Sequence, residues 1–160
     1  MAHLSILILT IGIPGAGKTT WVDQYVKEHP STFVISTDKI RKELTGDEQC
    51  LHPCQNDMIH DEARRRVKEI IGNSHNYGGN HGFGPTIVVD STNCEADEWF
   101  QYKKLGASIM IAKVFKLTPD EAMSRQMGRE RKVPFDILQM KYTQLLHDEK
   151  FLPCFFNLIW

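Results

Sequence analysis

The sequence predicts an α/β domain in which a four-stranded parallel sheet carries helices on both faces. Apolar, β-branched segments of strand length recur along the chain, and segments with helical periodicity follow them. A glycine-rich turn separates the first such strand from the first such helix. Strands that alternate with helices favour a parallel sheet, because each connection must return across one of its faces.

Four segments have the composition of buried strands. The first is rich in β-branched residues and is bounded by Gly12 and Pro14. The third runs directly into Asp90. The predicted strands are residues 3–10, 32–36, 86–89 and 108–116.

Six segments have helical periodicity, and two of them carry a clear start signal. Ser36 or Thr37 is placed to cap the second helix. Thr118, followed by Pro119 and by Glu121 three residues after the cap, begins the fifth. The predicted helices are residues 19–28, 38–44, 55–71, 96–105, 118–127 and 134–147.

Two further segments do not fit the alternation. Residues 72–85 are rich in Gly, Asn and His and contain almost nothing that could anchor a core, so we expect a mobile loop. Residues 151–160 are strongly apolar. A tail of this kind is expected either to pack back on the domain or to form a subunit contact.

Composition limits the protein class. A chain of 160 residues with 41% hydrophobic and 24% charged residues fits a single domain over residues 1–160. A net charge of −1 argues against a long phosphate-binding track, although it leaves room for a small basic pocket that holds a strand end. No apolar run could cross a bilayer and no signal peptide is apparent. The expected location is cytoplasmic, or the host cytoplasm for a viral protein.

The cysteines do not form a recognisable metal motif. Cys50, His52, Cys54 and His60 could be drawn as a zinc site, but no second cysteine pair or finger spacing supports it. We expect reduced, structural cysteines.

The turn after the first strand matches the phosphate-binding pattern GxxxxGK[ST] in full. Its glycines let main-chain amides converge on phosphate oxygens, Lys18 supplies positive charge to the β- and γ-phosphates, and Thr19 offers a hydroxyl ligand to Mg²⁺. We therefore expect the P-loop NTPase fold, with ATP and Mg²⁺ bound. The expected nucleotide-binding residues are Gly12, Ile13, Pro14, Gly15, Ala16, Gly17, Lys18, Thr19 and Thr20.

Asp38 and Arg41 follow the second strand and share one face of a helical turn. A carboxylate at the ligand edge of the sheet can accept the proton of an attacking hydroxyl, and a guanidinium can hold a phosphate. The alternative is an ordinary ion pair at a helix start.

Asp90 leaves the third strand at the same edge of the sheet. A carboxylate beside a phosphate loop commonly binds magnesium, directly or through water. With Thr19 it forms the expected metal site; the alternative is a cap for the next helix.

Arg125, Arg129 and Arg131 lie shortly before Val133 and Pro134. Arg125 and Arg129 have the i, i+4 spacing of residues on one helix face. Such repelling cations are tolerated best where an anion compensates them, and the triphosphate is such an anion. A solvated basic helix is the alternative.

These segments together resemble the polynucleotide kinase family of P-loop kinases, in particular the 5′-kinase domain of bacteriophage polynucleotide kinase-phosphatase. The resemblance rests on ILTIGIPGAGKTTW, ISTDKIRKEL, VVDSTN and RQMGRERKVPFDIL and covers most of the chain. It implies that Asp38 is the general base, that Arg41 contacts the acceptor phosphate or the phosphoryl group, and that Arg125 and Arg129 clamp ATP. No DxDxT-type phosphatase segment is present, and the family's third-motif acid aligns with either Asp90 or Ser91.

The leading hypothesis is therefore an ATP-dependent kinase of a nucleic-acid hydroxyl, with DNA or RNA as its partner and the 5′-hydroxyl of a polynucleotide as its acceptor. A second hypothesis keeps the chemistry and changes the acceptor to a 5-hydroxymethylpyrimidine base in DNA, a nucleoside or a small metabolite. A third, a nucleotide-dependent switch, does not explain a carboxylate–guanidinium pair beside the phosphate loop.

Overall fold

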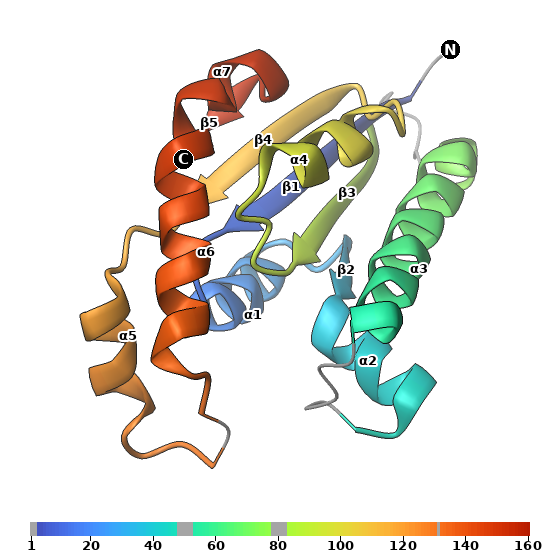
Figure 1. Ribbon diagram of the computed structural model, residues 1–160. Helices are drawn as coiled ribbons and strands as arrows, with labels where there is room; N and C mark the ends of the chain where they lie inside the picture. Colours follow the sequence, from blue (N-terminus) through green and yellow to red (C-terminus); the bar gives the residue numbers. More distant parts are fainter. Residues whose placement is uncertain (1–2, 48–52, 78–82, 131) are drawn as a thin grey trace.

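The computed structural model describes residues 3–47, 53–77, 83–130 and 132–160. Its centre is one five-stranded parallel sheet in the order β2-β3-β1-β4-β5 (Figure 1). The strands are β1 (Leu4–Ile11), β2 (Thr32–Ser36), β3 (Phe83–Asp90), β4 (Ile109–Val114) and β5 (Leu158–Ile159). The helices are α1 (Lys18–Glu28), α2 (Thr37–Thr45), α3 (Pro53–Gly72), α4 (Ala96–Lys103), α5 (Pro119–Gln126), α6 (Phe135–Asp148) and α7 (Leu152–Phe155), with short 3-10 turns at Ser74–Asn76 and Glu149–Phe151.

The predicted α/β fold with a parallel sheet is confirmed, but the predicted number of four strands is wrong. The fifth strand lies in the apolar tail and has only two residues, which pair with Ile111 and Ala112 of β4. The apolar tail packs back on the domain, which was one of the two expectations. Its residues Leu152 and Phe156 are buried in the core. A two-residue strand is too short to show a period in the sequence.

The loop predicted over residues 72–85 is shorter than expected. Strand β3 begins at Phe83, opposite Leu4 of β1. Tyr77 packs edge-on against Phe33 of β2 with ring centroids 4.8 Å apart, so this segment does carry an anchor. Residues 78–82 lie outside the described part of the chain.

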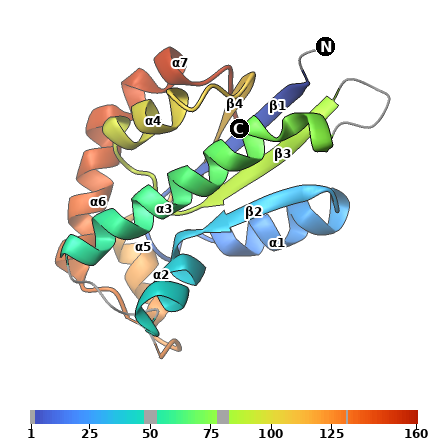
Figure 2. The same cartoon turned by 90° about the vertical axis from the view of Figure 1, so that its right-hand side faces the viewer.

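The two faces of the sheet are covered differently (Figure 2). Helix α1 covers one face, where Val22 packs on Ile8, Val88 and Ile111. The opposite face carries α3, α4 and α6 and holds the larger core, which includes the fully buried Trp99. The predicted helices on both faces are confirmed. In the described part of the chain, no helix combines the length and the hydropathy that a membrane span requires.

The order of the strands creates a switch point between β1 and β3. From β1 the chain crosses to β2 on one side, whereas from β3 it crosses to β4 on the other side. The loops after β1 and β3 therefore diverge and leave a crevice at the carboxyl edge, which is where ligands bind in open α/β sheets. Figure 1 shows α2 and α5 below the arrowheads at this edge.

Glu98 of α4 has a buried carboxyl whose Oε2 atom meets no hydrogen-bond donor in the described residues. Burial raises the pKa of Glu98 from 4.5 to about 7, although nearby Lys141 opposes the shift. Between these two values the folded protein holds a proton that the unfolded chain releases. The free energy of unfolding therefore falls as the pH rises from 4.5 to about 7.

We predict that Glu98→Gln removes this pH dependence. At pH 8 the variant should be more stable than the parent by on the order of 3 kcal/mol, because no charge is buried. At pH 5 the two should differ little. Urea unfolding at both pH values measures this, with the exposed Glu149→Gln as control. An unchanged pH slope in the Glu98 variant would contradict the assignment.

Candidate active site

The phosphate loop connects β1 to α1, and its glycines are required by its geometry. Gly15 and Gly17 have φ angles of 86° and 90°, a region that side chains with a Cβ rarely adopt. A Cβ on Gly12 would lie 3.0 Å from Phe115, which follows β4. The Gly12 amide donates to the carbonyl of Thr92, 3.0 Å away, so the loop is tied to the end of β3.

Lys18 is held inside the loop by main-chain oxygens. Its Nζ atom donates to the carbonyls of Gly12 and Ile13, each at 2.8 Å. Burial lowers the pKa of Lys18, while Cys94 and Asp90 act in the opposite direction. An anionic phosphate oxygen accepts a stronger hydrogen bond than a neutral carbonyl does, so the ammonium group can exchange these partners for a nucleotide phosphate.

Thr19 and Asp90 meet at the switch point. The Thr19 hydroxyl donates to Oδ2 of Asp90 at 2.9 Å, and Asp90 is 8% exposed. Burial raises the pKa of Asp90, whereas the Thr19 bond and Lys18 lower it. A hydroxyl and a carboxylate are oxygen ligands of the kind that Mg²⁺ binds, so the pair fits this ion chemically. The acidic residue of the family's third motif aligns with either Asp90 or Ser91. The alignment with Asp90 is the one that places a carboxylate against the Thr19 hydroxyl.

Asp38 and Arg41 share one face of α2, as expected, and they form an ion pair in its first turns. Nη1 of Arg41 lies 2.5 Å from Oδ1 of Asp38. The Arg41 side chain is 8% exposed and that of Asp38 is 57% exposed, so the guanidinium supports a carboxylate that faces solvent. Nη2 of Arg41 also donates to Oδ1 of Asn56 at 3.4 Å.

The pair lies close to the phosphate loop because of the strand register. Ser36, which precedes α2, stands beside Asp90 in the β2–β3 ladder. Its hydroxyl caps α2 by accepting from the amide of Lys39 at 3.4 Å, as one of the two cap predictions stated. The first turn of α2 therefore begins next to the Thr19–Asp90 contact.

Arg125 and Arg129 do not share one helix face. Arg125 lies on α5 and its Nη1 atom is 3.4 Å from the carbonyl oxygen of Gly15 in the phosphate loop. Helix α5 ends at Gln126, so the expectation that Arg129 shares a helix face with Arg125 is wrong. Met127 and Gly128 form a turn after the helix, and Arg129 lies exposed beyond it. Arg131 lies outside the described residues.

Several polar residues that the sequence did not single out hold the crevice together. Asn93 is fully buried with a φ of 44°; its Nδ2 donates to the Thr10 carbonyl at 2.9 Å, and its own carbonyl accepts from Nε1 of Trp99 at 2.6 Å. The Thr10 hydroxyl donates to the Ser91 carbonyl at 2.9 Å. An Asn shortly after a strand is the signal for this left-handed position.

The possible zinc cluster falls partly outside the described residues, since Cys50 and His52 are not among them. Within the described residues, no group of three or more His, Cys, Asp and Glu side chains could hold a metal ion. His60 lies on α3, where burial lowers its pKa.

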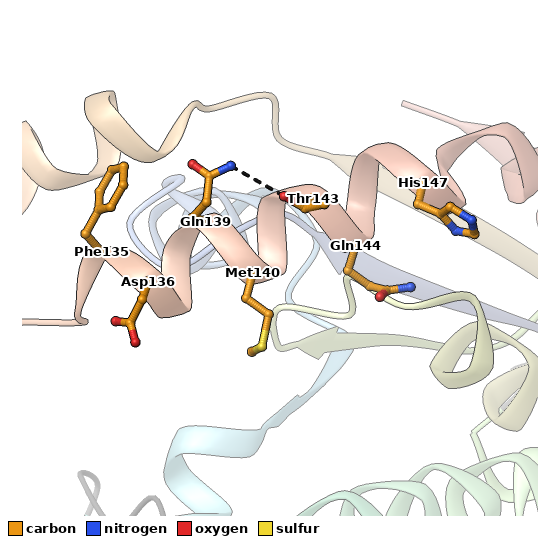
Figure 3. Close-up of a pocket in the computed structure, with 7 residues that line it drawn as sticks. All are labelled: Phe135, Asp136, Gln139, Met140, Thr143, Gln144 and His147. Atoms are coloured by element: carbon orange, nitrogen blue, oxygen red, sulfur yellow. Dashed lines mark hydrogen bonds between the residues drawn. The ribbon is translucent and has the colours of Figure 1, made fainter.

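An open groove of about 790 Å³ runs along α6 (Figure 3). Asp136, Met140 and Gln144 point to one side of the helix, and the amide of Gln139 donates to the Thr143 hydroxyl at 3.4 Å. The groove lies outside the phosphate loop, so its size alone assigns no function to it.

The fold and the phosphate loop together define the class of this molecule, which is that of P-loop kinase domains. The chain belongs to the AAA domain family, whose model (AAA_33) matches residues 7–145. The predicted P-loop kinase class is thereby confirmed.

Solved structures share this fold. A chain of the Pnkp1/Rnl/Hen1 RNA repair complex is 18% identical with a TM-score of 0.74; the match covers 94% of this chain but only 47% of that one. Shikimate kinase from Acinetobacter baumannii is 11% identical with a TM-score of 0.61, over 99% of this chain and 84% of its own. Gluconokinase from Sinorhizobium meliloti 1021 is 15% identical with a TM-score of 0.56, over 90% and 75%.

Proposed function

We propose that this chain transfers the γ-phosphoryl group of ATP to a hydroxyl group of a nucleic acid, with the 5′-hydroxyl of a polynucleotide as the preferred acceptor. The observation that carries the proposal is the Asp38–Arg41 pair, which stands beside Asp90 and the phosphate loop. A domain that only binds nucleotide has no need of a base for an incoming hydroxyl.

In this proposal the nucleotide phosphates lie on the loop from Gly12 to Thr20. The main-chain amides and the N-terminus of α1 bind their oxygens, and Lys18 places its charge at the β- and γ-phosphates. Arg125 reaches the loop from α5, and Arg129 follows on the adjoining segment. Both arginines would offset the charge that spreads over the phosphoryl group in the transition state.

Thr19 and Asp90 would hold Mg²⁺. When bound, the ion neutralises charge on the β- and γ-phosphate oxygens. The 2.9 Å contact between the Thr19 hydroxyl and the Asp90 carboxylate supports this assignment, because both groups already face the same point.

Asp38 would act as the general base. As the acceptor oxygen forms its bond to the γ-phosphorus, Asp38 takes the hydroxyl proton, and the bond from the γ-phosphorus to the bridging oxygen breaks to release ADP. Arg41 would hold Asp38 in place through one nitrogen and contact the acceptor phosphate or the transferring group.

The nucleic-acid acceptor is supported by the likeness to one chain of the Pnkp1/Rnl/Hen1 RNA repair complex. The shared fold covers 94% of the present chain. A small-molecule acceptor is the second candidate. It is favoured by the likeness to shikimate kinase and gluconokinase and by a net charge of only −1, which offers little attraction to a long polyanion.

The test is transfer of labelled γ-phosphate from ATP to a panel of acceptors. The panel contains 5′-hydroxyl DNA and RNA oligonucleotides, strands with internal 5-hydroxymethyluracil, nucleosides, shikimate and gluconate. We expect label at the 5′ end of the oligonucleotides and none on 5′-phosphorylated controls. Label at the internal base would select base modification, and label on a small molecule alone would replace the polynucleotide proposal.

A further inference from the structure

Gln126, the last residue of α5, makes an unusual pair of contacts with the main chain of Val133. Its Nε2 atom donates to the Val133 carbonyl at 3.2 Å, and its Oε1 atom accepts from the Val133 amide at 2.5 Å. A side-chain amide has the same donor and acceptor as a peptide group, so Gln126 replaces the partner that a neighbouring strand would supply. The residue is only 4% exposed.

These contacts bracket the loop between Gln126 and Val133, of which the structure describes residues 127–130 and 132. Arg129 lies inside the loop, and its amide donates to the carbonyl of Gln126 at 2.9 Å. Arg125 directly precedes Gln126 and reaches the phosphate loop. One buried side chain therefore joins the two ends of the segment that carries Arg129, and this segment begins one residue after Arg125.

We propose that Gln126 is a positioning residue for phosphoryl transfer, which fixes the segment around Arg129 by clamping the end of α5 to Val133, directly after the Arg125 that reaches the phosphate loop. The inference rests on the proposed function, because it gives Gln126 its effect through the arginine. Val133 is partly buried against the core and Pro134 begins the turn into α6, so the clamp ties the loop to a fixed part of the domain.

The side-chain chemistry makes the requirement specific. Glu at this position could still accept from the Val133 amide, but its second oxygen would face the Val133 carbonyl. Met fills a similar volume and offers neither a donor nor a strong acceptor, so both main-chain groups of Val133 would lose their partner.

The test compares Gln126→Met with Arg129→Ala and with the double variant. The assay measures transfer of labelled γ-phosphate to a 5′-hydroxyl DNA oligonucleotide. We expect Gln126→Met to lower kcat by roughly 10- to 100-fold, since small misplacements of a catalytic group have effects of this order. The double variant should be no slower than Arg129→Ala alone, because Gln126 has nothing left to position. The matched control is Gln24→Met, an exposed glutamine of α1 that pairs with Glu28.

Effects that multiply in the double variant would overturn the inference, since Gln126 would then act independently of Arg129. Wild-type kcat in Gln126→Met beside a slow Arg129→Ala would overturn it while the role of Arg129 stands. If Arg129→Ala is itself fully active, the proposed role of the arginine fails together with its positioning. If Gln126→Met does not fold, Gln126→Glu serves as the second variant, with an intermediate loss expected.

A second readout does not depend on the acceptor. Hydrogen exchange of the Val133 amide should accelerate at least tenfold in Gln126→Met and remain unchanged in Gln24→Met. Unchanged exchange would show that the clamp does not exist in solution, even if the transfer assay fails because the acceptor is a different molecule.

Discussion

Lys18→Met is expected to reduce phosphoryl transfer by about 10²- to 10³-fold, which is the usual loss when one donor to a developing charge is removed. Methionine keeps an unbranched side chain of similar length but carries no charge. The lysine is 8% exposed and its pKa is lowered by burial, so its removal relieves a cost of folding, but it also removes the donor to the carbonyls of Gly12 and Ile13. Because these two effects oppose each other, the melting temperature should change little while activity falls.

The measurement pairs steady-state transfer with thermal unfolding. The control is Lys27→Met, which removes an exposed lysine from the last turn of the same helix. That control should keep full activity. Transfer within threefold of the parent in Lys18→Met would rule out the proposed role of Lys18.

Asp38→Asn is expected to lower transfer by about 10²- to 10⁴-fold, the range over which a positioned general base contributes. Asparagine keeps the shape of the side chain and an oxygen that can accept from Arg41. The ATP dissociation constant should change by less than about threefold, because Asp38 lies on α2 and not on the phosphate loop. Single-turnover transfer and calorimetric titration with ATP separate the two effects.

Asp61→Asn is the matched control for this variant. Asp61 and Arg64 form another Asp–Arg pair with i, i+3 spacing, 2.6 Å apart, on α3. Loss of an exposed ion pair has little effect on stability, and this control should retain normal turnover. If Asp38→Asn also retains normal turnover, another group must take the hydroxyl proton.

The parts of the fold that the sequence predicted well are those in which local signals agree with burial. The first strand, the phosphate loop and α1 lie within one residue of their predicted bounds, because a buried β-branched run, fixed glycines and a helical period follow one another. The capping box at Thr118 and Glu121 likewise located α5. Its end also lies within one residue of the prediction, but the contact of Gln126 with Val133, seven residues later, was not readable from local spacing.

The candidate site divides in the same way. The contact between Thr19 and Asp90 follows from two motifs at the ends of adjacent strands, which a parallel sheet brings to one edge. The contact of Arg41 with Asn56 joins two helices, and nothing in either local sequence specifies it. Strand β5 was missed because its partner strand, β4, lies more than forty residues away in the chain and its pairing depends on that distant contact.

Helix α1 begins at the phosphate loop and also covers one face of the sheet. Nucleotide binding and the stability of the folded state are therefore linked by mass action. Unfolding of α1 would expose Ile8, Val88 and Ile111 and would abolish the anion site in the same event. A ligand that binds only the folded form at 100 times its dissociation constant adds about 2.7 kcal/mol to its stability. Bound nucleotide would thereby lengthen the lifetime of this protein against proteolysis, and removal of the nucleotide would shorten it.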